Sequence, residues 1–186
     1  MSFHFDAETH TYTLGERTLP GVTTILKEAG MIDVTWFTDE SRARGTAVHE
    51  AVFFDIHGDL DFDSLHPKIA PYLAAWDQFK RNTNFKPNLE LCEVPQYHPV
   101  YLYAGKPDLI GTLNGRNVLI DIKTGESPTA QFQTAAYANF PQIAKYSPAR
   151  FSLRLKPDGT YKLKNHSDYE DFPVFLQAFQ KIKNKS

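Results

Sequence analysis

The stretch of residues 105–137 constrains the fold of this 186-residue chain more than any other part of the sequence. Two apolar runs, residues 109–111 and 118–123, flank Asn114-Gly115, a strong signal of a tight turn between antiparallel strands. Alternate side chains of a strand share a face, so Asp121 and Lys123 point to the same side. The sequence therefore predicts a β-hairpin that carries an acid and a base together.

A helix is expected directly after this hairpin. The second strand ends at Gly125, and Ser127-Pro128 resembles an N-cap followed by proline at the first helical position. Gln133 and Tyr137 are i,i+4 neighbours and would share one face of the helix. We therefore expect a polar helical face behind the two strands.

Asp108, at the head of the first strand, adds a second carboxylate to this group. Two carboxylates that converge at one strand end suit Mg²⁺, which otherwise keeps water or phosphate oxygens as ligands. An ammonium beside them can orient or deprotonate a water nucleophile and offset charge on a phosphodiester. The alternative is that Asp121 and Lys123 form only a modest ion pair on a solvated strand face.

The succession G-x-P-D, hairpin, D-I-K-T-G and Q-x-x-x-Y resembles the RecB-like branch of the PD-(D/E)XK nuclease superfamily. This resemblance covers about residues 10–163. It implies an α/β fold with a restriction-endonuclease-like core, in which helices flank a central mixed sheet and an N-terminal helical segment precedes it. It implies that Asp108, Asp121 and the Ile122 carbonyl bind metal and that Lys123 positions or activates water. Gln133 would then hold the lysine or the backbone near the scissile bond, and Tyr137 would brace the helix or touch DNA.

The N-terminal half carries further parts of the resemblance. H-x-Y at residues 10–12, a predicted hairpin over 11–19 and P-G-V-T-T-I-L at 20–26 are similar to the N-terminal signature of phage exonucleases and of the mitochondrial genome-maintenance exonuclease. R-G-T-A-V-H-E lies in a long helix predicted over 39–57 and matches the family's G-x-x-x-H element. The match implies that His49 is a metal ligand, although a lone helical histidine is otherwise a surface or core residue. Arg42, nearly on the same helical face, is a candidate phosphate contact.

The remaining elements complete the predicted sheet and its cover. A short helix over residues 22–30, a helix over 67–82 with an apolar stripe, and a C-terminal helix over 168–183 are expected from apolar periodicity. Strands are expected over 86–97 and 100–103, and a last hairpin over 150–164. Glu93 falls in the first of these strands, and it is either a ligand of a second metal or an ordinary edge carboxylate.

Composition limits the classes of protein that fit. The length and a hydrophobic content of 41% suit a single domain, 1–186, with an N-terminal part, 1–85, that carries His49 and a catalytic core, 86–186. A net charge of −2 means that any DNA binding uses a local groove. The one cysteine, Cys92, excludes a disulfide framework and a four-cysteine iron–sulfur cluster and points to a reducing compartment. No apolar stretch is long enough for a membrane span or a signal peptide, so a cytoplasmic protein is expected.

The resemblance implies a Mg²⁺- or Mn²⁺-dependent DNA exonuclease that prefers single strands and serves phage or bacterial DNA recombination, repair or processing. A single-strand-binding or recombination protein is a candidate partner. Trp36 and Phe37 are candidates to stack on unpaired bases, or else they are core residues. The alternatives are a double-strand recombination exonuclease of the lambda type, a structure-specific endonuclease, and a non-catalytic DNA-binding module. Polarity, oligomeric state and the number of metals stay open.

Overall fold

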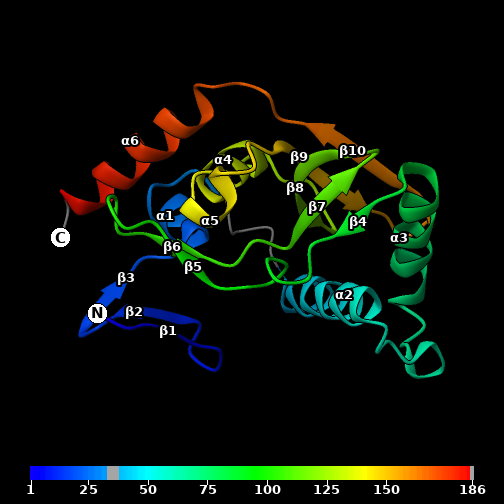
Figure 1. The fold of residues 1–186 in the computed structure, drawn as a ribbon. Coiled ribbons are helices and arrows are strands. Elements are labelled where there is room, and N and C mark those ends of the chain that lie inside the picture. The colour runs from blue at the N-terminus through cyan, green and yellow to red at the C-terminus, as the bar shows by residue number, and fades with distance from the viewer. Residues whose placement is uncertain (33–37, 185–186) are drawn as a thin grey trace.

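The computed structural model describes residues 1–32 and 38–184, so Trp36 and Phe37 lie outside the described residues. At its centre is a five-stranded mixed sheet with strand order β10-β9-β8-β7-β4 (Figure 1). Its strands are β4 (Lys86–Pro87), β7 (Leu109–Leu113), β8 (Arg116–Lys123), β9 (Ala149–Leu155) and β10 (Tyr161–Asn165). Neighbouring strands are antiparallel except β8 and β9, which are parallel. Helices flank this sheet, and the expected α/β class is confirmed.

The predicted hairpin is formed by β7 and β8. Asn114 and Gly115 both have positive φ angles, 48° and 80°, as the tight hairpin turn requires. Leu109 pairs with Ile120, and continuation of this register by one residue places Asp108 opposite Asp121. The hairpin therefore brings together two carboxylates that stand well apart in the sequence.

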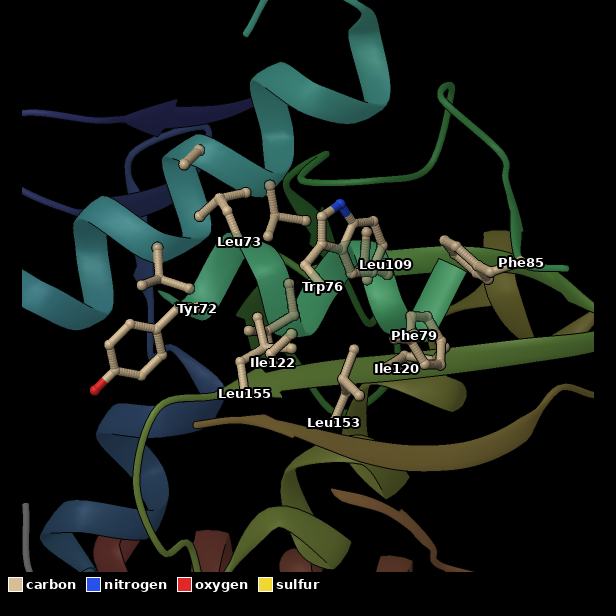
Figure 2. Close-up of a cluster of buried hydrophobic side chains, with 14 of the residues drawn as sticks. Tyr72, Leu73, Trp76, Phe79, Phe85, Leu109, Ile120, Ile122, Leu153 and Leu155 are labelled. Atoms are coloured by element: carbon tan, nitrogen blue, oxygen red, sulfur yellow. The ribbon is translucent and has the colours of Figure 1, made fainter. Parts of the chain in front are cut away.

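One face of the sheet is covered by α2 (Asp39–His57) and α3 (Ala70–Thr83). The predicted apolar stripe of α3 is buried there against sheet residues such as Ile120 and Leu153 (Figure 2). Helix α2 has the predicted bounds, but its expected apolar side is only partly right. Val48, Ala51 and Val52 are buried, whereas Ala43 and Phe54 are exposed.

The opposite face is covered by α1 (Val22–Glu28) and α4 (Ala130–Ala138), with α5 (Pro141–Ala144) and α6 (Asp171–Lys183) beyond them. Helix α6 packs mainly against α4 and α1, so it lies outside α4 rather than directly covering the sheet as expected. Helix α4 begins two residues later than predicted, and its N-cap, Thr129, makes no side-chain capping bond. The expected Ser127-Pro128 cap is therefore wrong.

The strands expected over residues 86–97 and 100–103 are also wrong in extent. Only β4 and two short strands, β5 (Gln96–Tyr97) and β6 (Ala104–Gly105), form, and β5 and β6 make a separate two-stranded sheet. Proline cannot donate to a strand ladder, and prolines at positions 87, 95 and 99 interrupt this region. Glu93 lies in a turn with a φ of 56° rather than on a strand.

The N-terminus forms its own three-stranded sheet, β1 (Phe3–Asp6), β2 (Thr11–Leu14) and β3 (Arg17–Leu19). The β2–β3 hairpin confirms the prediction, and β1 was not expected. Figure 1 shows this sheet at one edge of the molecule. The Ala104 N–H donates to the Pro20 carbonyl at 3.0 Å, so the residue after β3 is joined to β6. Among the described helices, none has the length and apolarity that a membrane crossing needs.

Candidate metal centre

Three side chains from separate segments form a compact group of possible metal ligands. His49 comes from α2, Glu93 from the turn before β5, and Asp108 from the residue before β7. One ligand atom from each lies within 4.8 Å of the others. The Nδ1 atom of His49 is 3.4 Å from Asp108 Oδ1 and 3.9 Å from Glu93 Oε1. This ligand triad (His49, Glu93 and Asp108) could hold a metal ion.

Backbone contacts fix the two carboxylates of the ligand triad. The N–H of Glu93 donates to the Pro107 carbonyl at 2.8 Å, which ties its turn to the residue before Asp108. Asp108 Oδ2 accepts the N–H of Ile122 at 2.6 Å, and Oδ1 is left toward His49. In a ladder the N–H and C=O of one residue point to the same edge, so the Ile122 carbonyl is directed toward Asp108, as a metal role for it would require.

The charges of the ligand triad support one another. Burial alone would lower the pKa of His49, but the neighbouring Asp108 and Glu93 outweigh burial and raise this pKa to about 10. Burial would raise the pKa of Asp108, yet His49, Lys123 and the Ile122 N–H hold it below its usual range. Without metal, an imidazolium at His49 therefore offsets part of the negative charge of the two carboxylates. A bound cation would take over this positive charge once His49 loses its proton.

A second group, the lysine relay (Asp121, Lys123, Gln133 and Tyr137), runs from β8 to α4. Lys123 Nζ is 2.7 Å from Asp121 Oδ2 and donates to Gln133 Oε1 at 3.0 Å. Gln133 Nε2 donates to the Tyr137 hydroxyl at 3.1 Å. The Asp121 side chain is only 1% exposed, so the alternative of a solvated strand face is wrong.

Asp121 is poorly satisfied without a further partner. Its Oδ2 atom pairs with the Lys123 ammonium at 2.7 Å, whereas its buried Oδ1 atom has no hydrogen-bond partner among the described residues. Burial raises the pKa of Asp121 to about 6, although Lys123 opposes this effect. A buried carboxylate with free acceptor atoms is costly unless something pairs with it. Together with the nitrogen and oxygen donors of the ligand triad, these atoms fit a divalent cation.

The ligand triad lies in an open cavity of about 790 Å³. Gln133, Tyr137 and parts of α1, α2 and β2 also line this cavity. Lys106 lines it too, and its Nζ is 2.5 Å from Glu93 Oε2. Sequence reasoning missed Lys106, whose only signal was a cation between the glycine and the proline of the G-x-P-D motif.

Arg42 is placed apart from this group. Its side chain is 59% exposed, pairs with Asp39 at 2.8 Å and does not line the cavity. Glu93, in contrast, joins His49 and Asp108 directly, which the sequence had left open. The structure thus brings together seven of the expected side chains, and a DNA contact by Arg42 stays a prediction.

Comparisons with known proteins add little to this geometry. No family model matches the chain, and no curated protein matches it. Among solved structures, a chain titled "Crystal structure of SSO0001" is similar over 88% of this chain and 85% of its own length, with 15% sequence identity and a TM-score of 0.39. A likeness this distant carries no argument about family or activity, so a functional conclusion has to come from the site.

Proposed function

We propose that this protein is a Mg²⁺- or Mn²⁺-dependent DNA exonuclease with a PD-(D/E)XK core, acting preferentially on single strands. The observation that carries the proposal is the meeting of two groups at one end of the β7–β8 hairpin. The ligand triad supplies nitrogen and oxygen donors within 4.8 Å, and Asp121 and Lys123 stand 2.7 Å apart beside it. A metal site with a positioned ammonium beside it suits metal-dependent phosphodiester hydrolysis, because both stabilise the negative charge that develops on the phosphate.

The donor set favours a hard divalent ion. Carboxylate, carbonyl and water oxygens suit Mg²⁺ and Mn²⁺, and one imidazole is compatible with Mn²⁺. His49, Asp108, Asp121 and the Ile122 carbonyl would hold this ion, with Glu93 as a further ligand. The sole cysteine, Cys92, is buried and donates its thiol to the Ile110 carbonyl at 3.3 Å, so an iron–sulfur cluster has no ligand set.

A bound divalent ion would stabilise negative charge on the scissile phosphate and lower the pKa of a water molecule. The Lys123 ammonium, held between Asp121 and Gln133, would orient the attacking water and offset the charge that develops on the phosphate. Gln133 holds this ammonium through Oε1. Tyr137 accepts the amide N–H of Gln133, and so keeps the amide oxygen turned toward Lys123. The lysine relay is therefore a positioning device for a single amine.

The shape of the cavity favours one strand over two. Residues from α1, α2 and β2 line the same cavity as the ligand triad. A flexible single strand can follow a cavity built from several elements, whereas a duplex has a fixed width set by its two paired backbones. The overall charge of −2 gives no general attraction for DNA, so recognition depends on this local surface.

Degradation of three end-labelled substrates tests the proposal: linear single strands, linear blunt duplex and circular single strands, each with Mg²⁺, Mn²⁺ or excess EDTA. We expect rapid metal-dependent loss of the linear single strand and an intact circle. Rapid cutting of the circle would instead establish an endonuclease. Faster loss of the duplex would favour the lambda type, and activity in EDTA would exclude the metal mechanism.

A further inference from the structure

Helix α2 exposes aromatic rings where an amphipathic helix would normally bury them. Phe53 and Phe54 line the cavity that holds the ligand triad, and Phe54 is 46% exposed. The apolar residues of the same helix that pack into the core, such as Val48 and Val52, are almost fully buried. A large ring left open beside a polar site suggests a role in contact with a ligand.

The spacing along α2 connects these rings to the metal ligand. Phe53 follows His49 by four residues, so the two side chains project from the same face of the helix, about 6 Å apart along its axis. That distance is comparable to the separation of a phosphate from the base of the same nucleotide. A nucleotide whose phosphate lies at the ligand triad could therefore place its base at Phe53.

The two rings are held in place by their neighbours. The His57 ring lies against Phe53 with centroids 4.3 Å apart, and His57 Nδ1 is 2.8 Å from the Phe53 carbonyl oxygen. Phe53 and Phe54 meet edge to face at 5.8 Å. Both contacts restrict rotation of the two side chains. The rings therefore lose little conformational entropy when a ligand binds to them.

The rest of the lining fits a nucleotide better than an apolar ligand. His10, in the turn before β2, and the largely buried Tyr12 are further aromatic residues of the lining. Glu93 and Asp108 with Lys106 make the region near His49 strongly polar. One cavity thus joins aromatic faces to a site for a charged group. Bases stack on aromatic faces irrespective of sequence, while phosphate belongs at the charged end.

We propose that Phe53 and Phe54 form a stacking platform for an unpaired DNA base next to the scissile phosphate. This inference rests on the proposed function and specifies how single strands are selected, since bases within a duplex are stacked on both faces, whereas an unpaired base can turn a face to these rings. The platform is indifferent to base identity, because stacking reads no hydrogen-bonding edge.

The test uses the double variant Phe53→Leu/Phe54→Leu, which keeps apolar side chains but removes the ring faces. Phe62→Leu is the matched control, since Phe62 is 63% exposed and does not line the cavity. Each protein is given a single strand with normal nucleotides near the end and the same strand with abasic residues there. Binding is measured in Ca²⁺ and cleavage in Mg²⁺, and 2-aminopurine at the terminal positions reports stacking by loss of fluorescence. Circular dichroism and thermal melting check that each variant is folded.

We expect the wild type and Phe62→Leu to bind the normal strand about 5- to 100-fold more tightly than the abasic strand, and to quench 2-aminopurine. The double variant should lose this preference and the quenching, while its affinity for the abasic strand stays the same. An undiminished preference in the double variant, or no preference in the wild type, would overturn the platform. If the wild type binds DNA in Ca²⁺ but cleaves none with Mg²⁺ or Mn²⁺, the nuclease proposal fails and the binding data still decide the platform. If it binds no DNA, both proposals fail.

Discussion

The ligand triad and the lysine relay are neighbours that are built in different ways. All members of the lysine relay fall within residues 121–137, and strand alternation and i,i+4 helix spacing align them. The ligand triad draws on a helix, a turn and the start of a strand that lie far apart in the sequence. Local geometry is therefore enough to arrange the amine, whereas the metal ligands exist as a group only in the folded chain.

The two groups also differ in how well they are satisfied without metal. In the ligand triad, His49 and Asp108 stabilise each other's charged forms, and their pKa values move in opposite directions, up and down respectively. In the lysine relay, burial raises the pKa of Asp121 to about 6, and its Oδ1 atom has no hydrogen-bond partner among the described residues. Asp121 thus links the two groups, because it pairs with Lys123 in the lysine relay and has an oxygen left for a metal ion at the ligand triad.

The largest effect is expected from Asp121→Asn. This change removes charge but almost no volume, so Mg²⁺-dependent cleavage should be abolished while the fold is retained. Cleavage of an end-labelled single strand and a thermal melt in EDTA measure the two effects, with exposed Asp59→Asn as control. Cleavage equal to the wild type would show that Asp121 neither binds a required metal ion nor supports Lys123 in the reaction.

Lys123→Ala should separate chemistry from binding. Loss of the ammonium is expected to lower the cleavage rate by about 10²- to 10³-fold, because a positioned group that stabilises developing negative charge is worth that much. The affinity for DNA in Ca²⁺ should change little, since the ligand triad is intact. A loss of affinity as large as the loss of rate would show that Lys123 only binds a phosphate group. The lysine relay and the ligand triad would then both serve binding, without a separate role for the relay in the chemical step.

Two glycine substitutions sharpen the comparison further. A Cβ atom on Gly105 would lie 2.6 Å from Tyr137 Cε1, so Gly105→Ala should displace Tyr137 and free the Gln133 amide. We expect about 10- to 100-fold slower cleavage, the usual cost of losing an outer partner of a metal site.

In Gly111→Ala the Cβ atom would lie 2.2 Å from the Lys86 carbonyl oxygen, where β4 pairs with β7. Gly111→Ala should therefore lower the free energy of unfolding by about 1–3 kcal/mol while the molecules that remain folded keep their rate. Urea denaturation and single-turnover cleavage distinguish the two variants. Similar rate losses in both, in proportion to their stability, would mean that the lysine relay has no role beyond packing.

The smallest effect concerns a buried histidine outside the site, His166, which is 6% exposed and lies 2.9 Å from the Ser152 hydroxyl. Burial, with Lys164 and Arg150, lowers its pKa below 6.5, and Asp171 only partly opposes this. The unfolded chain therefore takes up the proton first, so this contribution to stability is present above pH 6.5 and is lost as pH falls below it. His49 acts in the opposite sense.

His166→Gln should consequently show a smaller fall in melting temperature between pH 7 and pH 5 than the wild type. The exposed His4→Gln is the control, and it should keep the wild-type slope. An unchanged slope in His166→Gln would mean that His166 gains no charge on unfolding in this range.

Much of the fold follows from local patterns in the sequence. The Asn114-Gly115 turn, the bounds of α2 and the buried stripe of α3 were predicted because turn chemistry and apolar periodicity act over a few residues. The same is true of the lysine relay, whose members are aligned by the repeat of one strand and one helix.

Tertiary structure decided the rest, for physical reasons that periodicity does not encode. Prolines broke the strands expected before β6, and the resulting turn carries Glu93 to His49 and Asp108. Phe54 has the apolarity of a core residue but is exposed and lines a cavity. The sequence by itself determined which side chains each strand and helix presents, and only long-range packing determined which of these surfaces meet.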